Sequence, residues 1–163
     1  VLPLNPTSYG DSPYQSPASC AGNPYFIDLP TLYADGLITR EELKGARSDD
    51  KKINYGKLFT ERFALLRLAY SRFVPDADFK RFIKKNRDWI EDYALFMALK
   101  VKNGWRPWYE WQSEEKNHKK ARKSIGENEY ECGFWRWVQY TFFEQWQTVR
   151  NYAKMKMIRF LIT

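Results

Sequence analysis

A long loop that excludes regular secondary structure follows four apolar residues at the start of the chain. Residues 5–24, NPTSYGDSPYQSPASCAGNP, contain four prolines and two glycines. Proline removes a backbone donor and glycine favours turns, so neither a helix nor a strand is expected to run through this segment. An ordinary connection needs only about 4–6 residues. Because the segment alternates rigid turns with aromatic and polar side chains, we predict one fixed shape with a function.

The composition indicates a folded domain. The 163 residues are 44% apolar and 18% aromatic, more than a disordered chain carries. No apolar run reaches the roughly 18 residues of a membrane-spanning helix. Cys20 and Cys132 lie far apart, without the spacing of a disulfide framework or a metal site. We therefore expect free thiols in a reducing, cytoplasmic compartment.

Helical periodicity dominates the rest of the chain. Gly36 is expected to end a short helix, and Thr39 and Glu42 form the S/T-x-x-E capping box of the next one. Asp76 follows a proline and is expected to begin a further helix. The last helix is predicted over residues 130–155, where apolar side chains recur at helical spacing.

Two short apolar segments enclose these helices. Val1–Leu4 and Ile158–Ile162 read as buried strands. Two such strands joined through helices indicate a right-handed parallel crossover in an α/β protein. Because a usual crossover takes only about 30 residues, a helical subdomain is expected between them. Both ends of the chain are apolar, so we also expect it to be a piece of a longer protein.

The loop carries the side chains with the clearest binding chemistry. In α/β proteins the loop that leaves the carboxyl end of a parallel strand faces the ligand. Tyrosine rings offer flat apolar faces, and short polar side chains offer hydrogen bonds, which together suit a neutral, polyhydroxylated ligand. The candidates are Tyr9, Asp11, Ser12, Tyr14, Gln15 and Asn23. The loop lacks the clustered glycines and lysine of a phosphate-binding loop.

The same stretch closely resembles the 4-alpha-glucanotransferases known as amylomaltases or disproportionating enzymes, glycoside hydrolase family 77. The resemblance rests on LPLNPT, YGDSPYQSP and AGNPYFIDL. It continues through GLITREEL, NYGKLF and WIEDYALFMALK, and reaches FFEQW near the end. These motifs occur in the family's order and spacing over nearly the whole chain.

The resemblance implies an incomplete (β/α)8 TIM barrel, mostly helical because of a large insertion between two barrel strands. On that template, residues 1–29 would be a barrel strand plus the substrate-groove loop. Residues 30–129 would be the helical insertion subdomain, and residues 130–163 a long barrel helix and the following strand. The family transfers α-1,4-glucan segments between malto-oligosaccharides by a retaining double displacement. It needs no cofactor or metal, and its oligomeric state stays open.

The resemblance also assigns roles to individual residues. Tyr14 matches the tyrosine that packs against the sugar next to the scissile bond, and Ser12 and Asp11 match the polar part of the groove. Tyr9 and Phe59 match positions where aromatic side chains hold glucan away from the reaction centre. The family's catalytic carboxylates lie later in the barrel, so no catalytic residue is expected here. The isolated segment is predicted to be inactive.

Rival interpretations rest on other side chains. The net charge of +7 and the basic run KNHKKARK, residues 116–123, favour a helical module that binds nucleic acid or another anion. No aromatic residue interleaves that run as a stacking platform would require, so we expect neither a nucleic-acid nor a membrane partner. A third interpretation is an interaction protein formed by the helices alone. Trp105, Trp108 and Trp111 are expected in the core, and the lone His118 is expected to be exposed.

Overall fold

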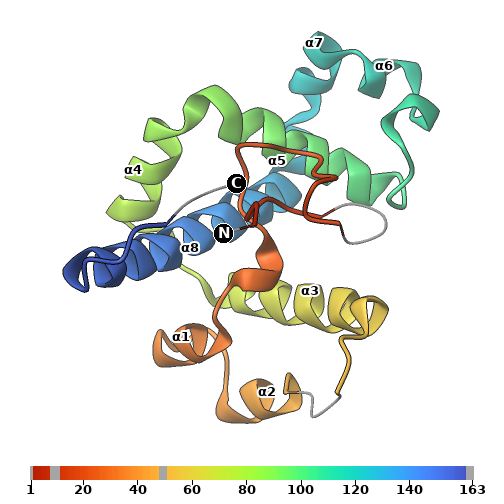
Figure 1. Cartoon of the computed structure of the whole chain (residues 1–163). Helices are drawn as coiled ribbons and strands as arrows, with labels where there is room; N and C mark the ends of the chain where they lie inside the picture. The colour runs from red at the N-terminus through yellow and green to blue at the C-terminus, as the bar shows by residue number, and fades with distance from the viewer. Residues whose placement is uncertain (1, 8–11, 48–50, 161–163) are drawn as a thin grey trace. The chain divides into compact units, whose positions relative to one another are not determined.

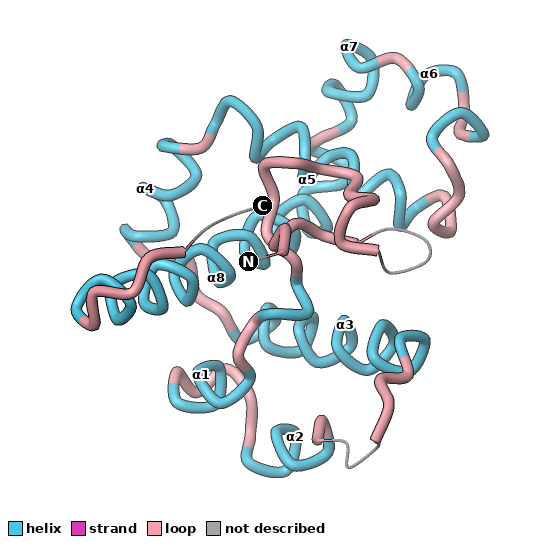
Figure 2. Tube along the Cα trace, viewed as in Figure 1, coloured by secondary structure: helices cyan, strands magenta, loops and turns pink. Residues whose placement is uncertain are grey.

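The computed structural model describes residues 2–7, 12–47 and 51–160, and these residues form helices joined by loops, without a strand (Figures 1 and 2). The α-helices are α1 (Leu29–Ala34), α2 (Arg40–Gly45), α3 (Tyr55–Arg72), α4 (Ala77–Lys85), α5 (Arg87–Lys102), α6 (Ser113–Lys116), α7 (His118–Ala121) and α8 (Glu129–Met155). The 3-10 helices are η1 (Pro24–Phe26), η2 (Trp108–Glu110), η3 (Arg122–Ser124) and η4 (Gly126–Asn128).

Neither segment expected to be a strand forms one over its described residues, 2–4 and 158–160. The Leu4 carbonyl instead accepts a hydrogen bond from the backbone N–H of Asn23, 2.8 Å away in the following loop. A strand exists only where a neighbouring strand supplies a ladder of such bonds. Apolar composition alone therefore does not produce a strand here.

The chain divides into two compact units. The first unit comprises residues 1–75 and 141–163, and the second comprises residues 76–140. The long helix α8 contributes residues to both units. The family template divides the chain differently, into two barrel parts and a helical insertion. That three-part division stays a prediction.

Local sequence signals set the helix ends in the first unit. Gly36 follows α1 with a φ of 73°, in the left-handed region that glycine adopts without strain. Thr39 and Glu42 form the expected capping box at the start of α2. The Thr39 N–H donates to Glu42 Oε2 at 2.7 Å, and the Glu42 N–H donates to Thr39 Oγ1 at 3.2 Å. Both predictions are confirmed.

An ion pair ties the end of α3 to α2. The two Arg72 Nη atoms lie 2.7 and 2.9 Å from the Glu42 carboxylate, and Nη1 also donates to the Leu37 carbonyl at 3.0 Å. The hydrogen bonds from Arg72, followed by that from the Thr39 N–H, lower the pKa of Glu42 to about 2. The same carboxylate thus serves as a helix cap and as an inter-helix contact.

The second unit has a core built on α5 and the first half of α8. Its fully buried side chains include Ile90, Leu99, Phe134, Trp135 and Trp137. The ring of Tyr93 meets Trp135 edge to face at 6.4 Å. Asp76 caps the start of α4, where it accepts a bond from the Phe79 N–H at 2.8 Å, as predicted. Burial raises the pKa of the Cys132 thiol, in the same core, to about 11.

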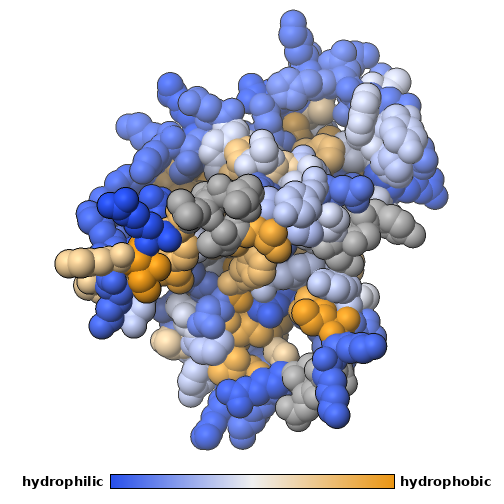
Figure 3. Space-filling view, in the orientation of Figure 1, coloured by the Kyte–Doolittle hydropathy of each residue, from blue (hydrophilic) through white to orange (hydrophobic). Residues whose placement is uncertain are grey.

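Apolar side chains stay exposed at the C-terminal end of α8. Met155, Met157 and Ile158 expose 74%, 93% and 56% of their surface. On the face shown in Figure 3, hydrophobic residues are visible at this end of α8 and at several other places, with hydrophilic residues around them. Among the helices that the structure describes, none is both long and apolar enough to cross a membrane.

The Glu42–Arg72 pair makes the first unit sensitive to acid. Because the pKa of Glu42 is lowered from 4.5 to about 2 by folding, the ionised pair stabilises the fold above about pH 4.5, and this contribution is lost as the pH falls through about 2. We expect Glu42→Gln to lower the thermal midpoint at pH 7 and to match the unmodified chain near pH 2. Thermal unfolding followed by circular dichroism measures both. The exposed neighbour Glu41, changed to Gln, is the control; an equal effect of both variants would contradict the assignment.

Candidate functional site

A four-residue turn presents Tyr14 to solvent. The Gln15 N–H donates to the Ser12 carbonyl at 3.1 Å, which closes a turn with Pro13 at its second position, where the fixed φ of proline favours turn formation. The Ser12 hydroxyl accepts a bond from the Tyr14 N–H at 3.4 Å. Tyr14 exposes 69% of its surface. The ring is therefore displayed on a short, internally bonded turn.

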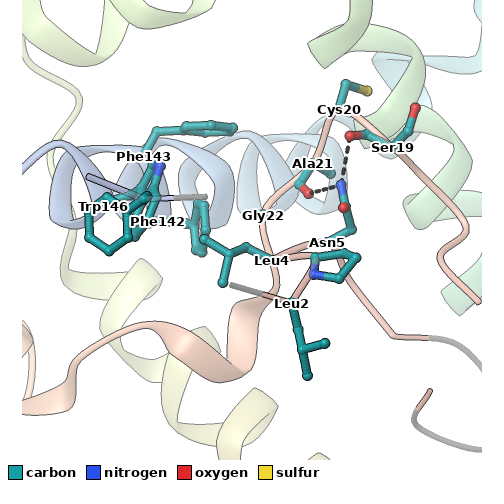
Figure 4. Close-up of a pocket in the computed structure, with 12 residues that line it drawn as sticks. Leu2, Leu4, Asn5, Ser19, Cys20, Ala21, Gly22, Phe142, Phe143 and Trp146 are labelled. Atoms are coloured by element: carbon teal, nitrogen blue, oxygen red, sulfur yellow. Dashed lines mark hydrogen bonds between the residues drawn. The ribbon is translucent and has the colours of Figure 1, made fainter. Parts of the chain in front are cut away.

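The side chain of Asn5 forms hydrogen bonds with the C-terminal part of this loop. Its Nδ2 lies 3.3, 2.6 and 3.2 Å from the carbonyl oxygens of Ala18, Ser19 and Ala21. An amide nitrogen carries two protons, so the three acceptors share them. Figure 4 shows two of these bonds. One side chain thus replaces the backbone ladder that a loop of prolines cannot form.

Close contact with α8 fixes the end of the loop. Gly22 lies so near the ring of Phe142 that a Cβ atom on Gly22 would come within 2.0 Å of Phe142 Cδ1. Asn23, the next residue, is 4% exposed, and its Oδ1 accepts the Tyr25 N–H at 3.0 Å to cap η1. Only glycine leaves room for the ring at this crossing.

Two side chains continue the attachment beyond η1. Gln145 of α8 pairs with the backbone of Asp28: its Oε1 accepts the N–H at 2.6 Å and its Nε2 donates to the carbonyl at 3.2 Å. Arg62 of α3 donates to the Ile27 carbonyl at 2.9 Å. Burial lowers the pKa of Arg62, although nearby Asp28 opposes the shift. The chain from the loop to α1 is thus bonded to both α8 and α3.

A cavity of about 400 Å³ lies in the first unit between the start of the chain and α8 (Figure 4). Its wall is mainly apolar, with Leu2 and Leu4 on one side and Phe142, Phe143 and Trp146 on the other. None of the described residues predicted to contact a ligand lines it. The cavity offers apolar packing surface rather than a set of hydrogen-bonding groups.

The structure brings three of the predicted site residues together. Ser12, Tyr14 and Gln15 share the one turn, with Tyr14 and Gln15 exposed. Asn23 is instead buried as a cap, and its role as a ligand stays a prediction. Phe59 is half-buried, with its ring edge-on to Phe63 at 5.1 Å.

Two further candidates, Tyr9 and Asp11, lie outside the described residues. Their predicted roles, a second glucan contact for Tyr9 and a groove ligand for Asp11, stay predictions. The turn around Tyr14 is thus the part of the predicted site that the structure places.

The neighbouring carboxylates Glu91 and Asp92 of α5, in the second unit, are engaged in ion pairs and are not a catalytic pair. Glu91 pairs with Arg136, with Oε2 2.7 Å from Nη2, and Asp92 accepts bonds from His118 at 2.9 Å and Arg122 at 2.8 Å. Although partial burial opposes ionisation, these two bonds hold the pKa of Asp92 below its usual value. The two carboxylates face different partners, as expected for neighbours on a helix. His118 is exposed, as predicted.

The basic run is partly neutralised by acids. Lys120 lies 3.4 Å from Glu114, and Arg122 pairs with Asp92. The aromatic connector, residues 105–111, differs from the core prediction. Trp111 is buried at 5% exposure, as predicted, but Trp105 and Trp108 are 36% and 57% exposed, so the prediction was wrong for these two. A proline, Pro107, precedes Trp108 and starts the turn that places its ring outside the core.

Sequence reasoning missed the residues that hold the loop in shape, above all Asn5, Gly22, Phe142 and Gln145. Asn5 had a usable signal, because a carboxamide at the head of a proline-rich segment often bonds nearby backbone groups. The Gly22–Phe142 and Asp28–Gln145 contacts join positions more than a hundred residues apart, and a single sequence carries no signal for such pairs.

A family model described as 4-alpha-glucanotransferase matches residues 1–162. A 4-alpha-glucanotransferase of Clostridium butyricum is 41% identical over 99% of the chain and 34% of its own length. The enzyme of the same name from Thermus thermophilus is 37% identical, with 99% and 33% covered. The solved amylomaltase of Streptococcus agalactiae in complex with acarbose matches with a TM-score of 0.87 and 28% identity, over 98% of this chain and 34% of its own. The chain thus spans about a third of the length of these relatives.

The glycine at the loop crossing gives a direct test of the site's architecture. We expect Gly22→Ala to destabilise the chain by about 1–3 kcal/mol, because the added methyl group must displace the buried ring of Phe142. Urea unfolding measures the free energy. The control is Gly45→Ala, where, among the described residues outside its own helix and chain neighbours, no atom lies within 4 Å of the new Cβ and stability should stay equal or rise. Equal stability of the two variants would contradict the crowded crossing.

Proposed function

The chain belongs to the 4-alpha-glucanotransferase family, glycoside hydrolase family 77, and on that premise we propose that it forms part of an enzyme that moves α-1,4-glucan segments between malto-oligosaccharides. Within that enzyme it contributes one wall of the substrate groove. The observation that carries the proposal is the Tyr14 turn: an aromatic ring 69% exposed, on backbone that its own hydrogen bonds and a proline hold in place.

The chemistry of the turn suits a sugar chain. A glucose ring presents C–H groups that pack on an aromatic face and hydroxyl groups that need hydrogen-bonding partners at the edge. Ser12 and Gln15, at the ends of the turn, carry a hydroxyl and a carboxamide on the same turn as Tyr14. The amylomaltase of Streptococcus agalactiae was solved with acarbose, which supports this class of ligand. We propose Asp11, Tyr9, Asn23 and Phe59 as further contacts.

The catalytic groups of the proposed enzyme lie outside this chain. A retaining double displacement needs a carboxylate nucleophile and a carboxylic acid about 5–5.5 Å apart across the scissile bond. The neighbouring carboxylates Glu91 and Asp92 do not fit that role, because each is bound to cationic side chains of its own. Groove residues alone bind substrate without supplying the transition-state chemistry.

The finer fold assignment also belongs to the proposal. We propose that residues 1–4 and 158–162 become neighbouring parallel strands of a (β/α)8 barrel in the longer protein. Support comes from the cavity in the first unit, where Leu2 and Leu4 share an apolar wall with Phe160. The ring of Phe160 packs against Trp146 of α8 at 5.2 Å. A cytoplasmic location is proposed on the free thiols alone.

Tyr14 is the residue that tests the groove. We expect Tyr14→Ala to weaken maltoheptaose binding to the chain about tenfold, because it removes the stacking face, an interaction worth roughly 1.4 kcal/mol. Tyr14→Phe should retain most of the affinity, since it keeps the ring. Isothermal titration calorimetry measures both. Tyr33→Ala, at a tyrosine 44% exposed on α1, is the matched control. Unchanged affinity of Tyr14→Ala would refute the groove.

A transfer assay tests the assignment of the chemistry. We expect the 163-residue chain to release no glucose from maltotriose above the uncatalysed background, because it lacks the proposed carboxylate pair. Glucose oxidase-coupled detection over several hours measures this. Turnover at an enzymatic rate that survives Glu91→Gln and Asp92→Asn would place an unrecognised nucleophile within the chain and overturn the assignment.

A further inference from the structure

The second unit contains a separate cavity of about 290 Å³ beside α5. One face of α5 forms its inner wall through Asp92, Leu95, Phe96 and Leu99, which recur at the three- and four-residue spacing of a single helix face. The opposite wall comes from η2 and from α6 and α7. Every residue of this cavity belongs to the second unit.

Two tryptophans give the cavity an aromatic floor and an exposed wall. Trp111 is 5% exposed, stacks near Phe96 at 5.5 Å with an interplanar angle of 36°, and donates from Nε1 to the Arg106 carbonyl at 3.0 Å. Trp108 also lines the cavity but leaves 57% of its surface in water. Trp135 and Trp137 of the same unit are buried, whereas the exposed surface of Trp108 is accessible to a ligand.

The backbone holds Trp108 in this position. The chain leaves α5 through Gly104 and Trp105, both with a positive φ, of 62° and 65°. Pro107 then starts η2, and the Glu110 N–H donates to the Pro107 carbonyl at 3.0 Å. A proline and a closed turn therefore limit the backbone conformations of Trp108. A ligand that stacks on its ring causes little further loss of backbone entropy.

The polar rim of the cavity consists of two paired carboxylates, Asp92 and Glu115, together with Lys116 and His118. Asp92 is paired with His118 and Arg122. Glu115 accepts bonds from Lys102 and from Asn103 Nδ2, both at 2.8 Å. Although partial burial opposes ionisation, these bonds lower the pKa of Glu115. An anion in the cavity would lie beside both carboxylates, whereas the hydroxyl groups of a neutral ligand could donate to their oxygen atoms. This favours a neutral, hydroxyl-bearing ligand over an anion.

We propose that this cavity is a surface site for the α-1,4-glucan chain, in which a glucose unit stacks on Trp108 and its hydroxyl groups reach the rim carboxylates Asp92 and Glu115. The site is separate from the Tyr14 turn, which lies in the first unit. Its ligand class rests on the proposed function. The site acts in binding alone, since its carboxylates are held by cations.

The test uses the indole N–H signal of Trp111, in the cavity floor, as a local reporter in two-dimensional ¹⁵N NMR of the 163-residue chain. With maltoheptaose we expect this signal to move in the unmodified chain and in Tyr14→Ala, with equal dissociation constants. In Trp108→Ala we expect an apparent dissociation constant raised about tenfold or more. Trp108→Phe should fall between the two. Tyr130→Ala, at a residue 62% exposed in the second unit and outside the cavity, should behave as the unmodified chain.

The outcomes separate this proposal from the previous one. A Trp111 signal that does not respond to maltoheptaose, or that responds equally in Trp108→Ala, overturns the surface site whatever happens at Tyr14. A response to cellohexaose of the same size overturns its preference for α-linked glucose. A response to inorganic phosphate or a short oligonucleotide, in place of maltoheptaose, assigns the cavity to the basic run instead. Failure of the groove alone appears as unchanged total affinity in Tyr14→Ala, with the Trp111 response intact.

Discussion

The side-chain amide of Asn5 is the interaction on which the loop depends. Residues 5–24 cannot satisfy their backbone carbonyls through a helix or a strand, because prolines interrupt both. Asn5 bonds three of those carbonyls at once, at Ala18, Ser19 and Ala21. These bonds join the two ends of the loop in the folded chain, so this part of the ordering cost is met on folding rather than on binding.

The contacts with α8 extend that constraint to the first unit. Gly22 crosses the ring of Phe142 with no space for a side chain, and Gln145, three residues further along α8, pairs with the backbone of Asp28. One helix face thus holds the chain at two points, one apolar and one polar. The apolar contact fixes how close the loop comes, and the pair of hydrogen bonds fixes its register, since a shift by one residue would leave both amide groups unpaired.

Predictions from the sequence succeeded where the signal was local and failed where it was not. The capping box of Thr39 and Glu42 and the cap at Asp76 depend on residues three apart, and the structure has both. The strand expectation at residues 1–4 depended on a partner strand, which hydropathy does not reveal, and the described residues form none. At the site, the motif YGDSPYQSP indicated Tyr14. It did not indicate the contact between Gly22 and Phe142, because these residues lie far apart in the sequence. The exposure of Trp108 was missed since an aromatic connector is usually core.

Tyr14 and Trp108 are presented by the same physical device in separate units. Each directly follows a proline, Pro13 or Pro107, within a turn closed by a backbone hydrogen bond. An exposed aromatic ring forgoes the roughly 25 cal/mol per Å² that burial would contribute. The turn compensates by fixing the backbone before any ligand arrives, so a stacked ring loses mainly side-chain freedom on binding. A neutral sugar benefits most from this arrangement, because it brings no charge to offset an ordering cost, whereas an anion could bind flexible lysines by electrostatics alone.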